Sequence, residues 1–207
     1  MNVGIQDKVI IRGRPTVFSV PAYVDGFAVT DPVDSRWDSS RKPVLAGENL
    51  ICTGMFSAIQ NLMARDVVNW QAVSVSVGFG GDYTQPATEG ASVSDTGQRV
   101  PAAFTDAYMR KPLYTAAIRL ADVSAILTEY RWIYTATLSP FGFDTDIGDP
   151  LKPYINEFGL LAANGTLLAH FIPPAAEDGT TVRRAKTDLE WWVIQWVVEF
   201  LGTATSE

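Results

Sequence analysis

The stretch that most restricts the fold of this chain is INEFGLLAANGTLLAHFIPP, residues 155–174. Two apolar runs, 158–163 and 166–172, flank Asn164-Gly165. This dipeptide suits a two-residue hairpin turn, because Asn tolerates the positive φ that the turn needs at both positions and Gly adopts it freely. The runs are apolar at nearly every position, whereas a sheet with one wet face alternates apolar and polar residues. The sequence therefore predicts a hairpin whose two faces both contact protein.

The C-terminal segment KTDLEWWVIQWVVEFLG, residues 186–202, fits both a helical and a strand period. Read as a helix, it has a capping-box match between Thr187 and Glu190 and an apolar stripe. Read as a strand, it has one wholly apolar face, and Gln195 and Glu199 lie on the other face. Three Trp and four β-branched residues in ten positions favour the strand, and a helix stays the alternative for 187–201. The apolar strand face consists of Trp192, Ile194, Trp196, Val198 and Phe200.

One packed α-helix is predicted at about residues 48–65, in ENLICTGMFSAIQNLMARD. An acid near its start and Arg65 near its end suit the helix dipole. Gly54 within it costs about 1 kcal/mol relative to Ala, so we expect a close packing contact there. The residues at helical spacing are Ile51, Met55, Ile59, Leu62 and Met63.

Further strands are predicted in AVSVSVGFGG, in KPLYTAAIRL and in TEYRWIYTATL. In the last of these, strand alternation separates the side chains into two sets. One face carries Tyr130, Trp132, Tyr134, Ala136 and Leu138, and the other carries Glu129, Arg131, Ile133, Thr135 and Thr137.

The first 47 residues have short β-prone runs, 9–11, 16–20 and 23–29, that Gly and Pro interrupt. Asp25-Gly26 predicts a second hairpin turn, and 30–49 predicts an irregular connection or an extended arm. The chain is therefore predicted to be mainly β, a β-sandwich or jelly-roll-like fold with one packed helix and an extended N-terminal arm. The predicted division is an arm and hairpin region at 1–47 and a β-sandwich domain at 48–207.

Charge and composition exclude several classes of partner. The net charge of −7 and the pI of about 4.7 argue against nucleic acid or an anionic membrane. A single cysteine, Cys52, forms no internal disulfide, and no Cys or His spacing suggests zinc. The longest uncharged apolar run, Trp191–Val198, is too short to span a bilayer, and we expect the chain to be made and folded in a cytoplasm.

No convincing catalytic, cofactor-binding or metal-ligating residues emerge, and no cofactor is predicted. VGFGGD, residues 77–82, lacks the following helix that a phosphate-binding loop needs. Asp144, Asp146 and Asp149 have alternating oxygen ligands but lack the bidentate acid of a complete calcium loop, which favours a solvated turn over a cation site. His170, the only histidine, has no nucleophile motif around it and is interpreted as a hydrogen-bonded strand residue.

Three weaker features leave alternatives open. Glu157 is expected to cap or form a salt bridge at the start of the hairpin, with general acid/base catalysis alongside an Asp of 144–149 as the enzymatic alternative. Arg183, Arg184 and Lys186 form a basic cluster that either contacts an acidic neighbour or is simply solvated. Aromatic side chains at Trp37, Trp70 and Tyr83 are the basis of another alternative, a carbohydrate- or receptor-binding module.

The order of segments resembles structural proteins of tailed bacteriophages. In these, an early helix like ENLICTGMFSAIQNLMA precedes a strand with a Gly-rich end like VSVSVGFGGDYTQPAT. A late I-x-E-x-G-L hairpin, here Ile155, Glu157, Gly159 and Leu160, is followed by a Lys-led, Trp-containing closing strand, here KTDLEWWVIQWVVEF. The resemblance spans residues 48–200 and implies a β-sandwich that self-associates in rings or trimers on a virion, in the tail, baseplate, fibre attachment or capsid decoration.

The function expected from the sequence is a non-enzymatic virion subunit, a homo-oligomer such as a trimer or hexamer that binds other virion proteins. Strands that are apolar on both faces agree with this expectation, because sister copies or a covering helix must hide the surplus apolar surface. The N-terminal arm and the long 78–106 segment are expected to carry contacts between subunits.

Overall fold

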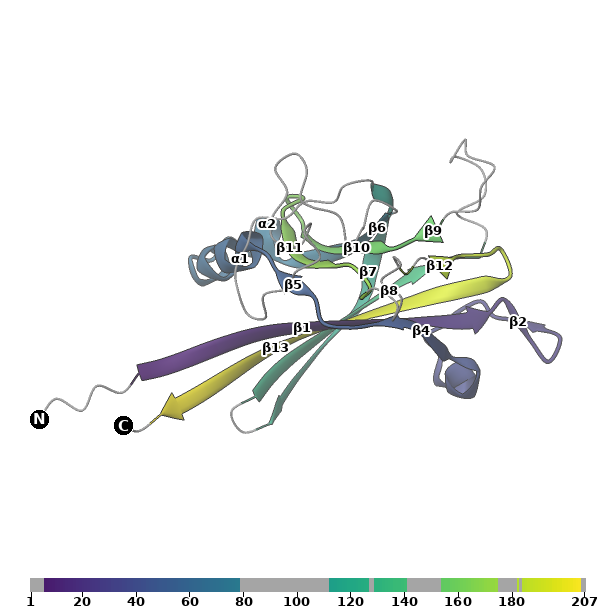
Figure 1. The fold of residues 1–207 in the computed structure, drawn as a ribbon, viewed down its shortest axis with the longest axis horizontal. Helices are drawn as coiled ribbons and strands as arrows, with labels where there is room; N and C mark the ends of the chain where they lie inside the picture. Colours follow the sequence, from purple (N-terminus) through teal and green to yellow (C-terminus); the bar gives the residue numbers. More distant parts are fainter. Residues whose placement is uncertain are drawn as a thin grey trace, which may run out of the picture.

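The computed structural model describes residues 6–78, 112–126, 129–140, 154–174, 182 and 184–205. The predictions for Tyr83, for Arg183, for 79–106 and for the three aspartates of 144–149 lie outside these residues. The fold is mainly β with few helices, as predicted (Figure 1). None of the helices in the described part of the chain is long and apolar enough to span a membrane.

The strands are β1 (Gln6–Pro21), β2 (Tyr23–Val24), β3 (Phe27–Ala28), β4 (Lys42–Ala46), β5 (Leu50–Ile51), β6 (Ala72–Gly78), β7 (Pro112–Ile126), β8 (Glu129–Leu138), β9 (Tyr154–Ile155), β10 (Glu157–Ala162), β11 (Leu167–Phe171), β12 (Arg184–Ala185) and β13 (Glu190–Thr205). The helices are the 3-10 helix η1 (Ser35–Ser40), α1 (Thr53–Met63) and α2 (Val67–Trp70).

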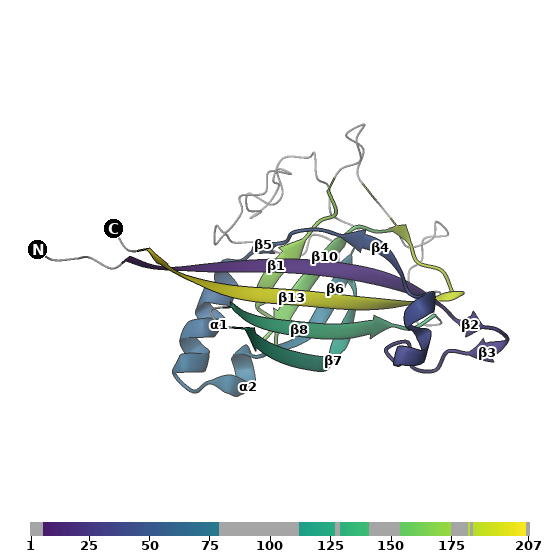
Figure 2. The same ribbon diagram turned by 90° about the horizontal axis from the view of Figure 1, so that it is seen from below.

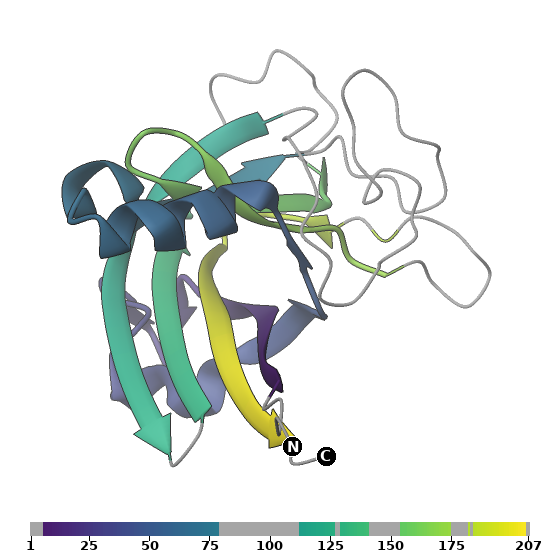
Figure 3. The same cartoon turned by 90° about the vertical axis from the view of Figure 1, so that its left-hand side faces the viewer.

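One nine-stranded sheet, in the order β4-β1-β13-β8-β7-β6-β10-β11-β5, forms the body of the molecule. All of its pairings are antiparallel. The sheet curls so strongly that its two end strands belong to one continuous segment, 42–51: β4 pairs with β1, and β5 pairs with β11 (Figures 1 and 3). Two halves of the sheet therefore face each other around a common core, as in a sandwich.

The closing strand β13 settles the ambiguity of the C-terminal segment in favour of a strand. It pairs along its length with β1 on one side and with β8 over Trp192–Leu201 on the other. Its predicted apolar face and the even-numbered face of β8 from Tyr134 to Leu138 both join the main core. The segment forms a strand and not a helix because its backbone N–H and C=O groups pair with the strands on both sides. In a strand, its large side chains at alternate positions all point to one face.

The hairpin of β10 and β11 is confirmed, and nearly every residue of both strands is buried. The predicted turn geometry is wrong at Asn164: of the turn pair, only Gly165 has positive φ, +82°. The backbone N–H of Gly165 donates to Ala162 at 2.9 Å, and Asn164 Oδ1 accepts from the Thr166 N–H at 3.0 Å. Residues 163–166 thus connect β10 to β11 with Gly165 in the left-handed position, and α2 fixes this connection, because the N–H of Asn164 donates to Asn69 O at 3.0 Å.

The predicted helix is confirmed as α1, with a later start than residue 48. Leu50 and Ile51 pair with β11 instead, so the chain becomes helical only from Thr53. The close contact predicted at Gly54 is present, since a Cβ there would overlap the carbonyl oxygen of Leu167 and would lie 2.6 Å from Thr166 Cγ2. Glycine thus lets α1 rest directly on the backbone at the start of β11.

The N-terminal segment is extended, as predicted, but β1 is one unbroken strand between β4 and β13 rather than several short runs. Gly13 and Pro15 do not interrupt it. The side chain of Asn49 occupies the space that a Cβ at Gly13 would need, and Pro15 uses its carbonyl to accept from the Gly47 N–H at 3.3 Å. Residues on both sides of the predicted division at 47 therefore share one sheet.

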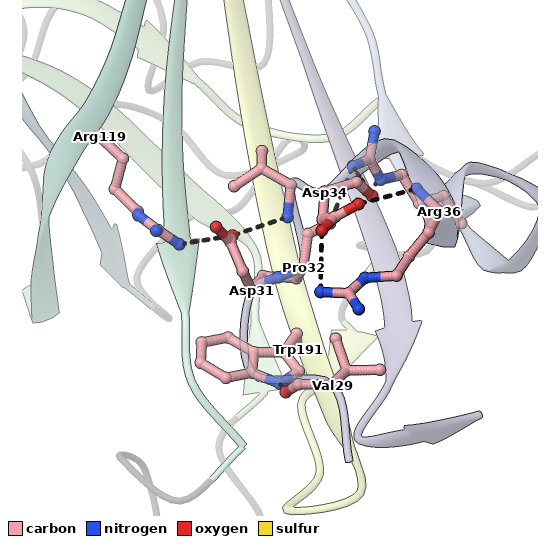
Figure 4. Close-up of polar contacts among 9 residues, drawn as sticks. Val29, Asp31, Pro32, Asp34, Arg36, Arg119 and Trp191 are labelled. Atoms are coloured by element: carbon pink, nitrogen blue, oxygen red, sulfur yellow. Dashed lines mark hydrogen bonds and ion pairs between the residues drawn. The ribbon is translucent and has the colours of Figure 1, made fainter. Parts of the chain in front are cut away.

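A second, smaller core lies on the opposite face of β13. Val20, Val29 and Val193 form it, and the indole Nε1 of Trp191 donates to Val29 O at 2.8 Å (Figure 4). The β2–β3 hairpin leaves this region toward one end of the molecule (Figures 1 and 2). Its Asp25-Gly26 turn has positive φ at both positions, 49° and 81°, as predicted from the sequence.

Candidate functional site

An apolar pocket of about 630 Å³ lies between the helices and the inner face of the curled sheet. Figure 3 shows α1 crossing this face above β7, β8 and β13. The helical wall of the pocket comes from α1, α2 and the residues that follow them, and the sheet wall comes from β8, β10, β11 and β13. Its lining residues are Met55, Ala58, Ile59, Leu62, Met63, Trp70, Gln71, Ala72, Trp132, Tyr134, Leu160, Leu168, Val198 and Phe200.

The chemistry of this pocket is almost wholly apolar. On the sheet wall, the rings of Trp132 and Phe200 meet edge to face with centroids 4.8 Å apart. Tyr134 contributes a phenol, and burial raises the pKa of Tyr134 above its ordinary value of 10.0, so the phenol stays neutral. A surface of this volume and character binds apolar or aromatic groups and offers nothing that would activate a nucleophile.

Several apolar side chains of α1 and α2 are exposed, and two of them, Leu62 and Met63, also line the pocket. Met63, at the end of α1, is 82% exposed, and Val68, on α2, is 76% exposed. Phe56, Leu62 and Val67 are also exposed on the same two helices. Scattered exposed apolar residues are ordinary, but exposed apolar residues that also line a pocket, as Leu62 and Met63 do, are typical of an interaction surface.

Beside the pocket, four strands extend away from the rest of the sheet. Residues 6–12 of β1 pair only with β13, and residues 118–126 of β7 pair only with β8, among the residues that the structure describes. This extension, formed by parts of β1, β13, β8 and β7, has the start of β1 and the end of β13 at its tip (Figure 2). Within the described chain it therefore has two open strand edges.

Glu157 and His170 form a buried pair on neighbouring strands. His170 Nε2 lies 3.0 Å from Glu157 Oε1, and the two side chains are 1% and 0% exposed. Phe158 follows Glu157 in the chain, Phe171 follows His170, and both Phe side chains face the core. Strand alternation therefore puts Glu157 and His170 on the opposite face of the sheet. The sequence predicted a hydrogen-bonded histidine within a strand and a partner for Glu157 at the start of the hairpin. The contact between these two residues accounts for both predictions.

A smaller polar cavity of about 390 Å³ lies where the segment before η1 meets β7. Arg119 Nη1 is 3.1 Å from Asp31 Oδ1, and Arg36 Nη2 is 2.9 Å from Asp34 Oδ2 (Figure 4). Asp34 also accepts from the Arg36 N–H, at 3.0 Å, and so caps η1. Each of the two carboxylates already has an arginine partner. The Asp31–Arg119 contact connects the segment before η1 to β7, and Asp34 stabilises the start of η1.

Other residues considered from the sequence are separate from one another. Cys52 is buried directly before α1, and the described residues contain no group of three His, Cys, Asp or Glu placed to hold a metal. Trp70 lines the apolar pocket, whereas Trp37 lies on η1 with the Arg36 guanidinium 5.1 Å from its ring centre. The two Trp residues therefore belong to elements at opposite ends of the molecule and do not form one stacking surface (Figure 2).

Within the predicted basic cluster, Arg184 and Lys186 differ. Arg184 is exposed on β12, but Lys186 is 3% exposed, and its Nζ donates to the carbonyls of Thr187 at 3.1 Å and Glu190 at 3.0 Å. Lys186 thus holds the turn that leads into β13. The prediction of a solvated or partner-binding cluster is wrong for this residue.

The apolar pocket was not anticipated from the sequence, although both of its walls were. The helix stripe and the apolar faces of β8 and β13 were each predicted, and each was assigned to a closed core. The space between the two walls depends on where α1 crosses the sheet, and no local sequence pattern indicates that position. A comparison with protein families, with curated proteins and with solved structures found no match for this chain.

Proposed function

We propose that the protein is a non-enzymatic structural subunit of a tailed-phage virion, one that self-associates and docks on other virion proteins. The observation that carries this proposal is the four-stranded extension with its two open edges. The virion location and a ring or trimer arrangement rest on the resemblance of segments 48–200 to phage structural proteins.

Open strand edges favour association because they present unpaired backbone N–H and C=O groups in register. Residues 6–12 and 118–126 are long enough for another strand to pair with each of them. Monomeric proteins protect such edges with short strands, bulges or covering loops, and the described chain has no covering element on either one. Pairing of one edge with the other edge of a neighbouring copy would generate a closed ring or a filament.

The buried state of the titratable groups also supports a structural role. Glu157 and His170 are at most 1% exposed, so no substrate reaches their paired atoms without a rearrangement of the strands. The larger of the two cavities described above is apolar. A net charge of −7 keeps such a chain soluble until the correct partner covers its apolar surface.

Light scattering coupled to size exclusion, combined with hydrogen–deuterium exchange at low and high protein concentration, tests this proposal. We expect a discrete oligomer, in which amides of 6–12 and 118–126 exchange more slowly than in the diluted chain. Amides of β8 are the internal control, because strands flank β8 on both sides in the monomer itself. A chain that stays monomeric at all concentrations, with exchange independent of concentration, would contradict the proposal.

A further inference from the structure

We propose that the β2–β3 hairpin of one copy inserts into the apolar pocket beneath α1 of a second copy, so that subunits join head to tail. This inference rests on the proposed self-association and specifies one of its contacts. The hairpin and the pocket are different parts of the chain from the two open strand edges, residues 6–12 of β1 and 118–126 of β7.

The hairpin projects from the body of the molecule with an exposed aromatic residue on each face. Tyr23 is 61% exposed and Phe27 is 71% exposed. Tyr23 pairs with Ala28 and Phe27 pairs with Val24, and directly paired residues share a face, so the two rings point to opposite sides. Exposed aromatic residues on a preformed turn are typical anchors of protein interfaces, because little conformational freedom is lost when they bind.

The pocket has the matching form, with two apolar walls. Met55, Ile59 and Met63 belong to the helical wall, and Trp132 and Phe200 belong to the sheet wall. A hairpin that enters between the walls places one aromatic ring against each of them. Hairpin side chains that are exposed in the free chain then fill the apolar pocket of about 630 Å³.

The charges at the two ends are complementary. Asp25 is exposed at the tip of the hairpin, and Arg65 is exposed two residues after Met63, which ends α1 and lines the pocket. Neither residue forms an ion pair with any residue in the part of the chain that the structure describes. Insertion of the hairpin brings an unpaired acid to an unpaired base, which favours this orientation of the two copies.

The position of the two parts excludes filling of the pocket within one molecule. In Figures 1 and 2 the hairpin lies at one end of the long axis, and α1 lies toward the other end. The contact therefore joins different surfaces of two copies, and repetition of such a contact produces a ring or an open filament.

Mixing two defective variants tests the contact. The hairpin variant is Tyr23→Asp/Phe27→Asp, and the pocket variant is Leu62→Asp/Met63→Asp; all four side chains are exposed, so the fold should tolerate the changes. Each variant alone should self-associate about tenfold or more weakly than the unaltered chain in sedimentation velocity. A mixture should form a 1:1 heterodimer, because one intact hairpin then meets one intact pocket.

Matched controls are Leu189→Asp, an exposed apolar residue near the hairpin end, and Val68→Asp, an exposed apolar residue of α2 outside the pocket lining. Both controls should associate like the unaltered chain, and circular dichroism checks the fold of every variant. Normal association of both defective variants, absence of the mixed dimer, or a small apolar molecule retained in the pocket in native mass spectra would overturn the inference. Oligomers that persist in both variants leave the proposed function standing, whereas an unaltered chain that never associates removes both.

Discussion

His170 Nε2 on β11 and Glu157 Oε1 on β10 lie 3.0 Å apart, with both side chains fully enclosed. The two residues are not directly paired in the register, since His170 lies opposite Gly159. The absence of a side chain at Gly159 leaves the diagonal between them free. A buried polar pair of this kind is retained only when each partner satisfies the other, because an unsatisfied buried polar group is costly.

The first prediction concerns the coupling between these two residues. Glu157→Leu and His170→Leu should each lower the free energy of unfolding by about 1–3 kcal/mol, because each removes one side of a buried hydrogen bond. In urea denaturation, the double variant should lose less unfolding free energy than the two single variants lose in total. Additivity of the two changes within about 0.5 kcal/mol would show that the contact carries no coupling.

A second prediction concerns Gly54. Gly54→Ala should destabilise the protein, although alanine is favoured over glycine within a helix by about 1 kcal/mol. The added methyl group would displace α1 from the Leu167 carbonyl, and overpacking of this kind costs about 1–3 kcal/mol. Thermal denaturation should show the loss. Gln60→Ala, at an exposed position of the same helix, is the control and should leave the midpoint nearly unchanged; a stabilised Gly54→Ala protein would mean that the contact is loose.

The third prediction separates Lys186 from its basic neighbour. Lys186→Met keeps much of the buried aliphatic volume but removes the donor of two carbonyl contacts, so we expect a loss of about 1.5 kcal/mol or more in unfolding free energy. Arg184→Met, at an exposed position, should change it by less than about 0.5 kcal/mol. Equal effects in chemical denaturation would contradict the structural role of Lys186.

The fourth prediction is a dependence of stability on alkaline pH through Tyr134. Burial raises the pKa of this phenol in the folded protein above the ordinary value of 10.0. Above about pH 10 the unfolded chain therefore releases the proton while the folded chain keeps it, and the unfolding free energy falls as pH rises. Between about pH 9 and pH 11, the unfolding free energy of Tyr134→Phe should decline less steeply than that of the unaltered chain. Urea denaturation at intervals of about one pH unit measures both slopes. Identical slopes would show that Tyr134 does not contribute.

The strand pattern was accessible from sequence because it is local. Alternation correctly assigned to the core the even-numbered residues of 134–138 in β8 and of 192–200 in β13, whereas Tyr130, on the same predicted face of β8, is exposed. The turn at Asp25-Gly26 followed from the backbone freedom of its two residues, and Gly54 signalled a close approach. Each of these features depends on the period of a strand or on the steric properties of one residue.

Other features depended on neighbours distant in the chain. Asn164 avoids positive φ because α2 binds its backbone N–H, and β1 continues through Gly13 and Pro15 because Gly47 and Asn49 pair with them. The candidate site belongs to this class as well, since helix and sheet residues separated by up to 145 positions, from Met55 to Phe200, line one pocket.

The sequence by itself thus determined the mainly β class, the hairpins, the helix and the apolar faces, since residue type and spacing act over a few positions. Only the tertiary structure decided that the sheet curls back on segment 42–51, that four strands extend with open edges, and that Glu157 meets His170. Those outcomes arise from packing and pairing between distant segments, whose free energies no local pattern records.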